Sequence, residues 1–395
     1  MTQRLATEAF QRPETYEALR RSVDDASTLI PDAYTAPEFH KLEQEHVFAQ
    51  GWVAVGCTSE FTESGEVKLR RVGGRSMLIV RDKSGTLRAF HNVCRHRGTQ
   101  LITEDGKHQR IRCRYHGWTY GLDGRCQGAP FFEKSRNPDT TPTFCKEDFS
   151  LFPVVLEVWG FVVFVNLSDS PQPLSEWLGD LPERLAGHPL EQFEVNAQKD
   201  YEVNANHKLC AENFMEYYHL PTVHPELSEV SRVEDHHRWQ GPGAYTGMVT
   251  RPVSRDRNSV WVNLPEAPGL SEEHRDASYH IWIFPNVAIT LLPNHAFCLI
   301  NEPLAAKQTC EHTYLLTPAG SQETEPYQEW FEVLAEFWNM VNLQDVGIIE
   351  QVHAGLEHPA FTGGRMCFRF EEPLHRYQNW IADRMLGLDR IPPGD

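Results

Sequence analysis

The sequence predicts an α+β protein in which a small antiparallel β-domain precedes a larger α/β domain, whose antiparallel sheet is covered by helices. Three observations predict this class. Short apolar runs separated by tight-turn residues follow Trp52, which is the spacing of antiparallel strands. A proline-bearing stretch at residues 170–173 then interrupts the chain. Beyond it, further strand-like runs precede one long segment with helical periodicity, at about residues 326–355.

We expect three regions in the chain: an N-terminal helical arm at residues 1–37 that packs on the larger domain, the small β-domain at 38–168, and the larger domain at 169–395. At the junction of the first two regions, Thr35-Ala-Pro-Glu38 reads as a capping box that opens a helix ending before Gly51. The strands expected after it are 67–72, 76–81, 87–93, 152–157 and 160–167.

The larger domain contains the elements on which the functional predictions depend. The sequence predicts a helix at residues 207–220 and a second, long helix at 326–355. The strands expected between these helices are 279–284, 287–292, 297–300 and 313–316.

Composition and charge exclude several classes of function. The chain has 395 residues, enough for two or three domains of ~150 residues each. Its 37 basic and 55 acidic residues give a net charge of −18, which makes nucleic acid and anionic lipid unsuitable partners. No apolar run approaches the ~20 residues of a membrane span, and residues 1–21 contain no apolar signal core. Nine cysteines, an odd number without a regular framework, favour reduced thiols and a cytoplasmic location.

The first metal-binding pattern lies in the β-domain. Cys94-Arg-His96 and Cys113-Arg-Tyr-His116 each offer one thiolate and one imidazole from a short loop. A structural zinc ion also accepts two Cys and two His, but zinc fingers usually keep both Cys in one loop and both His on one helix. Alternating types suit a two-iron, two-sulfide cluster in which His replaces Cys on one iron. We therefore prefer the 2Fe-2S cluster and keep zinc as the alternative.

These two loops resemble those of a Rieske protein. Respiratory Rieske proteins carry an additional Cys in each loop, joined as a disulfide, and a Ser that hydrogen-bonds a cluster sulfur. This chain has Thr99, Tyr115 and Trp118 at those positions. Because this chain has neither the disulfide nor that hydrogen bond, the resemblance implies a reduction potential toward the low end of the Rieske range.

The second metal-binding pattern lies in the larger domain. His219 and His224 are five residues apart, so one continuous helix would turn them away from each other. Pro221 between them is expected to break the helix and let His224 return toward the metal. Non-heme iron that activates dioxygen is commonly held by two His and one carboxylate.

The carboxylate is expected from the long helix. Leu334, Trp338, Val341, Ile348 and Val352 form an apolar stripe in which one position is Asp345. An inward-pointing carboxylate needs a partner or a metal, so Asp345 is the predicted third ligand and Glu350 the fallback.

The Glu-Asn-Phe segment, the His pair and the distant Asp resemble the catalytic half of Rieske non-heme iron oxygenase α subunits. The resemblance implies a helix-grip catalytic domain and a head-to-tail homotrimer. Family members have an Asp three residues before the first His that bridges it to the cluster His of a neighbouring subunit; this chain has Glu216 there, with Glu212 as a rival. Glu216 and Asn213 are therefore the candidate catalytic residues.

The expected function is that of a terminal oxygenase, which uses O2 to hydroxylate or oxidatively demethylate a small substrate. Electrons from NAD(P)H are expected to come through a separate flavin/iron-sulfur reductase, because the chain has no Gly-x-Gly-x-x-Gly fingerprint. A non-catalytic Rieske electron-transfer protein and a zinc-dependent structural protein are the competing classes.

The overall pattern resembles most closely the branch of choline monooxygenase and of glycine betaine and stachydrine demethylating enzymes, which implies a quaternary ammonium substrate. Cis-dihydroxylating aromatic-ring dioxygenases are the alternative. Aromatic rings attract cations by ~0.5–2 kcal/mol each, and several are expected in the sheet over the iron. The candidate pocket residues are Trp261, Tyr279, Trp282, Phe284 and Phe297.

Overall fold

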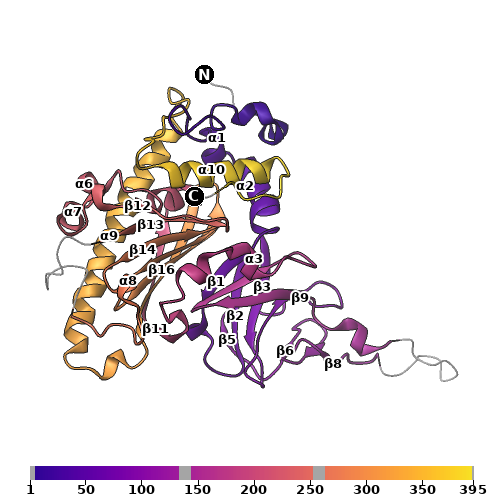
Figure 1. The fold of residues 1–395 in the computed structure, drawn as a ribbon. Coiled ribbons are helices and arrows are strands. Elements are labelled where there is room, and N and C mark those ends of the chain that lie inside the picture. Colours follow the sequence, from indigo (N-terminus) through magenta and orange to yellow (C-terminus); the bar gives the residue numbers. More distant parts are fainter. Residues whose placement is uncertain (1–4, 133–143, 252–262, 394–395) are drawn as a thin grey trace. The chain divides into compact units, whose positions relative to one another are not determined.

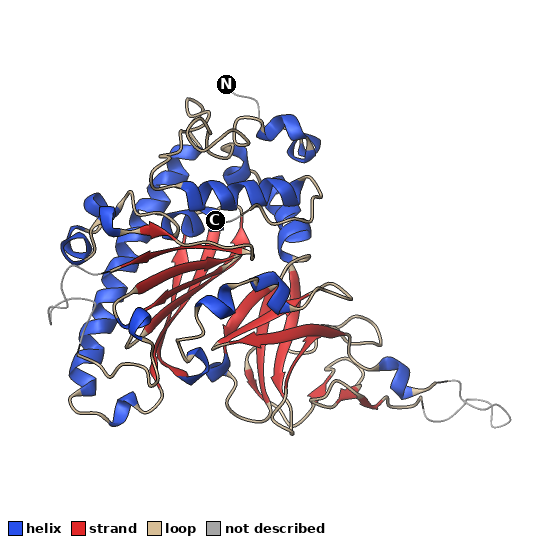
Figure 2. Cartoon of the chain, in the orientation of Figure 1, coloured by secondary structure: helices blue, strands red, loops and turns tan. Residues whose placement is uncertain are grey.

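The computed structural model describes residues 5–132, 144–251 and 263–393. The chain divides into two compact units. The smaller comprises residues 49–51 and 55–171, and the larger comprises the remainder. Figure 2 shows that strands and loops dominate the smaller unit, whereas helices gather around the sheet of the larger one. The two units therefore have the α+β composition that the sequence predicts.

The smaller unit is built on an antiparallel sheet of seven strands in the order β1-β10-β9-β4-β3-β2-β5, with a three-stranded sheet β6-β7-β8. Tight turns with left-handed glycines make this possible, as at Gly73 and Gly74 between β2 and β3. The strands are β1 Val53–Cys57, β2 Glu66–Val72, β3 Arg75–Arg81, β4 Leu87–His91, β5 Gly106–Lys107, β6 Ile111–Arg112, β7 Thr119–Tyr120, β8 Cys126–Gly128, β9 Pro153–Trp159 and β10 Val162–Asn166.

The larger unit contains a second seven-stranded antiparallel sheet, in the order β11-β17-β16-β15-β14-β13-β12. Its central strands are buried along most of their length, so both faces are covered. The strands are β11 Phe193–Val203, β12 His237–Arg238, β13 Tyr245–Thr250, β14 Ser278–Ile283, β15 Val287–Leu291, β16 Ala296–Ala305 and β17 Gln308–Pro318. The helices are α1 Asp32–Thr35, α2 Pro37–Glu43, α3 Leu174–Leu178, α4 Leu181–Arg184, α5 His207–Phe214, α6 Leu220–Val223, α7 Pro225–Val230, α8 Glu272–Arg275, α9 Tyr327–Leu356 and α10 Glu372–Met385.

Helix α9 runs along the sheet of the larger unit (Figure 1). Its side chains reach three strands. Asn339 accepts a hydrogen bond from Tyr201 on β11, Trp338 stacks on Phe297 of β16, and Asn342 donates to Glu311 of β17. The helix therefore covers the β11-β17-β16 edge and brings its polar positions over the sheet.

The N-terminal segment packs on α2 and α10. Phe10 lies edge-on to Phe39 of α2, with the ring centroids 5.2 Å apart. The Gln378 amide oxygen on α10 accepts a hydrogen bond from the Leu29 N–H at 2.7 Å. Residues up to Phe48 belong to the larger unit, whereas the sequence analysis placed the change of region at residue 37. Phe48 explains the difference, because its ring contacts His207 of α5.

The predicted capping box at residue 35 is wrong. Helix α2 begins at Pro37 with Ala36 as its N-cap residue and without a side-chain cap, because the Thr35 hydroxyl instead donates to the Pro31 carbonyl. Proline tolerates this first-turn position, where its missing N–H is not needed. The helical arm consists of short 3-10 turns at Thr7–Gln11 and Pro13–Tyr16 and the single turn α1.

Candidate metal centres

The two Cys-His loops of the smaller unit have the same backbone design. In each loop, a glycine N–H donates to the carbonyl of the cysteine four residues earlier, from Gly98 to Cys94 at 3.0 Å and from Gly117 to Cys113 at 3.1 Å. Both glycines have φ near +73°, a conformation that costs other residues about 1–2 kcal/mol. Both cysteines are buried at the base of their loops.

The histidines of the two loops face each other. The His96 and His116 rings lie 4.7 Å apart, and Trp118 stacks on His96 with an interplanar angle of 5°. Among the described residues, no three donor atoms of these loops lie within 4.8 Å of one another. The ligands of a single zinc ion would lie that close together. The donor set of two buried thiols and two outer imidazoles fits a two-iron cluster.

His219, His224 and Asp345 come together in the larger unit. Their ligand atoms all lie within 4.8 Å of one another, with the Asp345 carboxylate oxygen 2.8 Å from His224 Nε2 and 3.6 Å from His219 Nε2. Two nitrogens and one oxygen converging in this way are the donor set of a mononuclear iron site. The hydrogen bond to Asp345 raises the pKa of His224, against the effect of burial.

The outer nitrogens of both histidines are held by oxygen acceptors. Glu216 lies 2.5 Å from His219 Nδ1, and the Gln344 amide oxygen lies 2.7 Å from His224 Nδ1. An acceptor at Nδ1 favours the tautomer that keeps the Nε2 lone pair free for a metal. Glu216 is itself fixed, because its second oxygen accepts the backbone N–H groups of Tyr218 and His219.

A cavity adjoins the three convergent ligands. It has a volume of about 100 Å³, smaller than the ~300–1,000 Å³ of sites for drug-sized ligands. Its described lining contains three carboxyl groups, Glu216, Glu311 and Asp345, and no arginine or lysine. Rings contribute much of its wall: Phe214, Tyr217, Phe297 and Trp338.

Comparison with known families decides what these centres belong to. Residues 190–387, half of the chain, match the family model described as "Ring hydroxylating alpha subunit (catalytic domain)", and residues 51–144 match "Rieske [2Fe-2S] domain". The chain is a Rieske oxygenase α subunit. The predicted recognition and the enzyme class are therefore confirmed, and the competing classes of zinc protein and inert electron carrier are not supported.

Relatives cover nearly all of this oxygenase. A "Glycine betaine monooxygenase oxygenase subunit" of Chromohalobacter salexigens is 30% identical over 98% of this chain and 92% of that protein. A "Carnitine monooxygenase oxygenase subunit" of Acinetobacter pittii is 28% identical over 86% of this chain and 88% of that protein. The solved structure of the quaternary ammonium Rieske monooxygenase CntA with an inhibitor superimposes with a TM-score of 0.78 at 24% identity, over 98% of this chain and 100% of that one, which shows the fold alone.

Membership of the family confirms the predicted cofactors. The oxygenase has a Rieske 2Fe-2S domain and a catalytic domain for mononuclear non-heme iron, it uses O2, and a reductase supplies its electrons. Among the described residues, no helix is long and apolar enough to cross a membrane.

The two carboxyl groups that were alternatives to the predicted residues have other hydrogen-bond partners. Glu350 accepts hydrogen bonds from the backbone and side chain of Asn204 and does not join the convergent group. Glu212 points elsewhere too, since its carboxyl accepts from the Tyr34 hydroxyl and the Gln378 amide. Glu216 is therefore the carboxylate beside His219, whereas Glu212 belongs to a buried contact with α10.

Two details of the helical predictions are wrong. The helix expected at 207–220 ends at Phe214, well before Pro221, which instead occupies the first turn of α6. The bend that separates His219 from α5 is thus formed by residues 215–219, and Pro221 is the second residue of α6. In α9, Ile349 and His353 continue the buried stripe after Asp345 at spacings of four, whereas Val352 is 45% exposed.

The predicted aromatic pocket is corrected in most of its members. Phe297 lines the cavity, but three of the other rings do not: Tyr279 contacts His274 and Trp239, Trp282 lies behind Phe214, and Phe284 packs on Tyr377. Strand alternation accounts for Tyr279, whose neighbours Ser278 and His280 face the cavity. Trp261 lies outside the described residues.

The cavity wall also contains residues that the sequence did not single out. Asn213 was a candidate and does line the cavity, whereas Trp338, Glu311 and Asn342 line it but were missed as site residues. Gln344, the hydrogen-bond partner of His224 outside this lining, was missed too. Helical spacing could have found Asn342 and Trp338, because they lie three and seven residues before Asp345 and thus on the same face of α9. No comparable signal pointed to Glu311, which a strand brings from another part of the chain.

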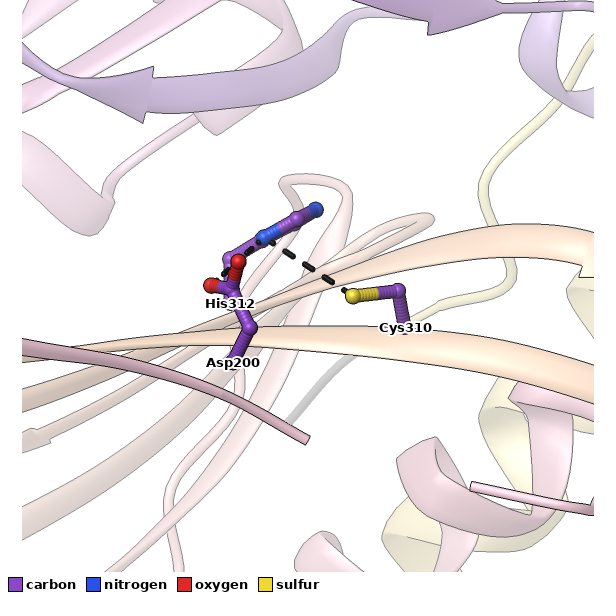
Figure 3. Close-up of side chains that lie close together, drawn as sticks. All are labelled: Asp200, Cys310 and His312. Atoms are coloured by element: carbon purple, nitrogen blue, oxygen red, sulfur yellow. Dashed lines mark hydrogen bonds and ion pairs between the residues drawn. The ribbon is translucent and has the colours of Figure 1, made fainter. Parts of the chain in front are cut away.

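Asp200, Cys310 and His312 form a second convergent group (Figure 3). Strand alternation places Cys310 and His312 on the opposite face of β17 from Glu311. His312 Nδ1 lies 2.9 Å from Asp200, and its Nε2 lies 3.3 Å from Glu302. Burial alone would lower the pKa of His312, but its hydrogen bonds to Cys310, Glu302 and Asp200 raise it to about 11. A protonated imidazole between two carboxylates accounts for this group without a metal.

Proposed function

We propose that the oxygenase hydroxylates a small quaternary ammonium compound on a carbon next to nitrogen. One oxygen atom of O2 enters a C–H bond, and the other leaves as water with two electrons and two protons. When the carbon is an N-methyl group, the hydroxymethyl product releases formaldehyde and leaves a tertiary amine. The relatives whose names specify glycine betaine and carnitine support this class of substrate.

The observation that carries the proposal is the charge of the cavity. An anionic aromatic acid would need an arginine or lysine near the reacting centre, and the described lining contains neither. A cation is instead attracted by carboxylates and by the faces of aromatic rings. The cavity offers both, and its small volume suits a compact head group.

Each residue of the site has a separate proposed role. His219, His224 and Asp345 would hold the iron, which when bound supplies activation of dioxygen. Glu216 and Gln344 hold the two imidazoles in the tautomer that binds metal. Cys94, His96, Cys113 and His116 would hold the cluster that stores the incoming electron. Asn213 offers an amide at the cavity wall that can orient a polar group of the substrate.

The finer assembly is also proposed. We infer a homotrimer in which Glu216 joins His219 to His116 of the neighbouring subunit, and a flavin/iron-sulfur reductase as electron donor. The 12% side-chain exposure of Glu216 leaves it open to a second partner, and His116 is exposed. None of the nine cysteines forms a disulfide, which supports a reducing, cytoplasmic location. The three regions 1–37, 38–168 and 169–395 stay a proposal for the domains, with residues 38–48 grouped with the larger unit.

A substrate panel tests the proposal. The purified oxygenase, loaded with both metal centres and paired with a surrogate reductase, is given choline, glycine betaine, carnitine and proline betaine, with benzoate as the aromatic acid. We expect formaldehyde or a hydroxylated product, in proportion to NADH consumed, from at least one cation. Product is measured directly, because uncoupled oxidation of NADH mimics activity. A cis-diol from benzoate without product from any cation would overturn the proposal.

A further inference from the structure

Glu311 is a buried carboxyl group in the cavity wall that the metal centre does not use. It lies on β17, is 3% exposed, and faces the cavity between α5 and α9. Burial raises the pKa of Glu311 to about 7, partly opposed by its hydrogen bonds to Asn342 and Cys210. The group is therefore costly to keep ionised unless a positive charge comes close.

The protein supplies hydrogen bonds to Glu311 but no counter-ion. Asn342 Nδ2 donates to the carboxyl at 3.1 Å, and the Cys210 thiol is its second partner. Across the described chain, no ion pair joins Glu311 to an arginine or lysine. The described lining of the cavity contains no arginine and no lysine. The buried carboxylate of Glu43, by contrast, lies 2.7 Å from the Lys208 ammonium. Glu212 is also buried with neutral partners, Tyr34 and Gln378, but it does not line the cavity.

This combination suits a quaternary ammonium group in particular. Such a cation has no N–H, so it cannot donate a hydrogen bond and is recognised through its charge and its methyl surface. A carboxylate whose oxygens are already hydrogen-bonded can still supply charge. An ammonium with N–H groups would in addition need free acceptor sites, two of which Asn342 and Cys210 already occupy.

The neighbouring wall is arranged for the methyl surface. Trp338 and Phe297 stack with a centroid distance of 4.7 Å and an angle of 3°. The Trp338 ring is held by a hydrogen bond from its Nε1 to His295 at 3.1 Å, so its orientation is fixed before substrate binds. Asn342 lies one helical turn before Asp345, which places the Glu311 contact next to the metal ligands.

We propose that Glu311 is the counter-ion of the substrate's quaternary ammonium group and selects cationic substrates over neutral ones of the same shape. The inference rests on the proposed function and extends it to a recognition residue. Because Glu311 lies near Asp345, the charged nitrogen is held beside the iron. This location explains why a carbon attached to nitrogen would be the one that reacts.

The test compares a cation with its neutral carbon analogue. The probes are choline and 3,3-dimethylbutan-1-ol, in which carbon replaces the charged nitrogen. Dissociation constants are measured by calorimetry on the holoenzyme of the wild type, Glu311→Gln and Glu302→Gln. Glu302→Gln is the matched control, because this substitution also removes one carboxylate, but from the opposite face of the same sheet.

We expect the wild type to prefer the cation, and Glu311→Gln to lose about tenfold or more in affinity for the cation, equal to about 1.4 kcal/mol. Affinity for the neutral analogue should not change, and Glu302→Gln should behave as wild type toward both probes. Equal loss for both probes, or none, would assign Glu311 a structural role.

If Glu311→Gln does not fold, the wild type still decides: equal affinity for the two probes would overturn the inference. Failure of the proposed function has a different signature, since no cation would then yield coupled product in the panel. A cation that is turned over but bound independently of Glu311 removes only this inference.

Discussion

Gln344 shows how single residues outside the ligand set control a metal site. Its amide oxygen accepts from His224 Nδ1 at 2.7 Å and so fixes both the tautomer and the ring orientation. Replacing Gln344 with Leu should weaken the binding of Fe(II) about 10- to 100-fold, the usual cost of losing such a contact. Gln344→Glu keeps an acceptor at this position and should retain affinity. Titration of the iron-depleted protein with Fe(II) measures both, and equal affinity in wild type and Gln344→Leu would contradict this role.

Asp345 and Glu350 provide a second comparison between residues. Asp345→Ala should lose the mononuclear iron and all turnover but keep the brown cluster, so iron falls from about three to about two per chain. Glu350→Ala is the matched control on the same helix, because Glu350 only accepts hydrogen bonds from Asn204. Iron analysis and the visible spectrum distinguish the two variants. Retained iron and activity in Asp345→Ala would show that the third ligand lies elsewhere.

Residue spacing predicted the convergence of His219, His224 and Asp345 but not their surroundings. Cys-x-His, Cys-x-x-His and the His pair are short-range patterns whose chemistry is readable from the sequence. Asp345 was found because one polar residue interrupts an apolar stripe. The cavity wall depends on which strands meet which helix, so Glu311 and the orientation of Tyr279 could not be predicted from local sequence.

At the scale of elements, the long helix expected at 326–355 agrees with α9 to within a residue at each end. The strands were predicted unevenly, since β16 and β17 extend up to five residues beyond the expected 297–300 and 313–316. Runs such as 67–72 and 287–292 agree with β2 and β15 to within a residue. Polar strands were missed, as with β11, which has no sustained apolar alternation yet pairs with β17 along its length. Helix α5 ended early because residues 215–219 turn to present His219 and Glu216, which a helical pattern cannot anticipate.

The contact between α5 and α10 predicts a pH dependence of stability. Glu212 of α5 is buried against Gln378 of α10 and Tyr34, and burial raises its pKa to about 7. An acid whose pKa is higher in the folded state than in the unfolded state contributes its full stability at pH values below the unfolded-state pKa. This contribution is lost as the pH rises through the folded-state pKa of about 7. Glu212→Gln should therefore be stabilised relative to wild type at pH 8, by up to about 3 kcal/mol, but not at pH 4.5.

Thermal unfolding of both proteins at the two pH values measures this effect. Glu350→Gln serves as the control, since its carboxylate lies at the exposed end of a hydrogen bond to Asn204. The same difference between wild type and Glu212→Gln at both pH values would show that the carboxyl stays ionised throughout.

At the scale of the whole molecule, the proposed trimer determines where electrons travel. If each cluster reduces the iron of a neighbouring subunit, a chain that lacks its cluster can still react when its neighbour carries one. His116→Ala removes a proposed cluster ligand, and His219→Ala removes a proposed iron ligand together with its contact to Glu216. Trimers of either variant alone should be inactive, because every route lacks its donor or its acceptor.

Mixed trimers of these two variants separate transfer between subunits from transfer within one. The two variant chains are mixed in equal amounts, either by co-expression or by unfolding and refolding together. The mixed trimers should regain about a quarter of wild-type turnover, because half of the clusters and half of the iron sites are intact and pair at random. Transfer within one subunit predicts no recovery, since each chain lacks one of its two centres. Product formation per chain, with trimer composition verified by mass spectrometry of differently tagged chains, measures the outcome. Adding Glu216→Gln to the His116→Ala chain, whose iron receives the electron, should then slow the recovered turnover, because it replaces the carboxylate that holds His219 with a neutral amide.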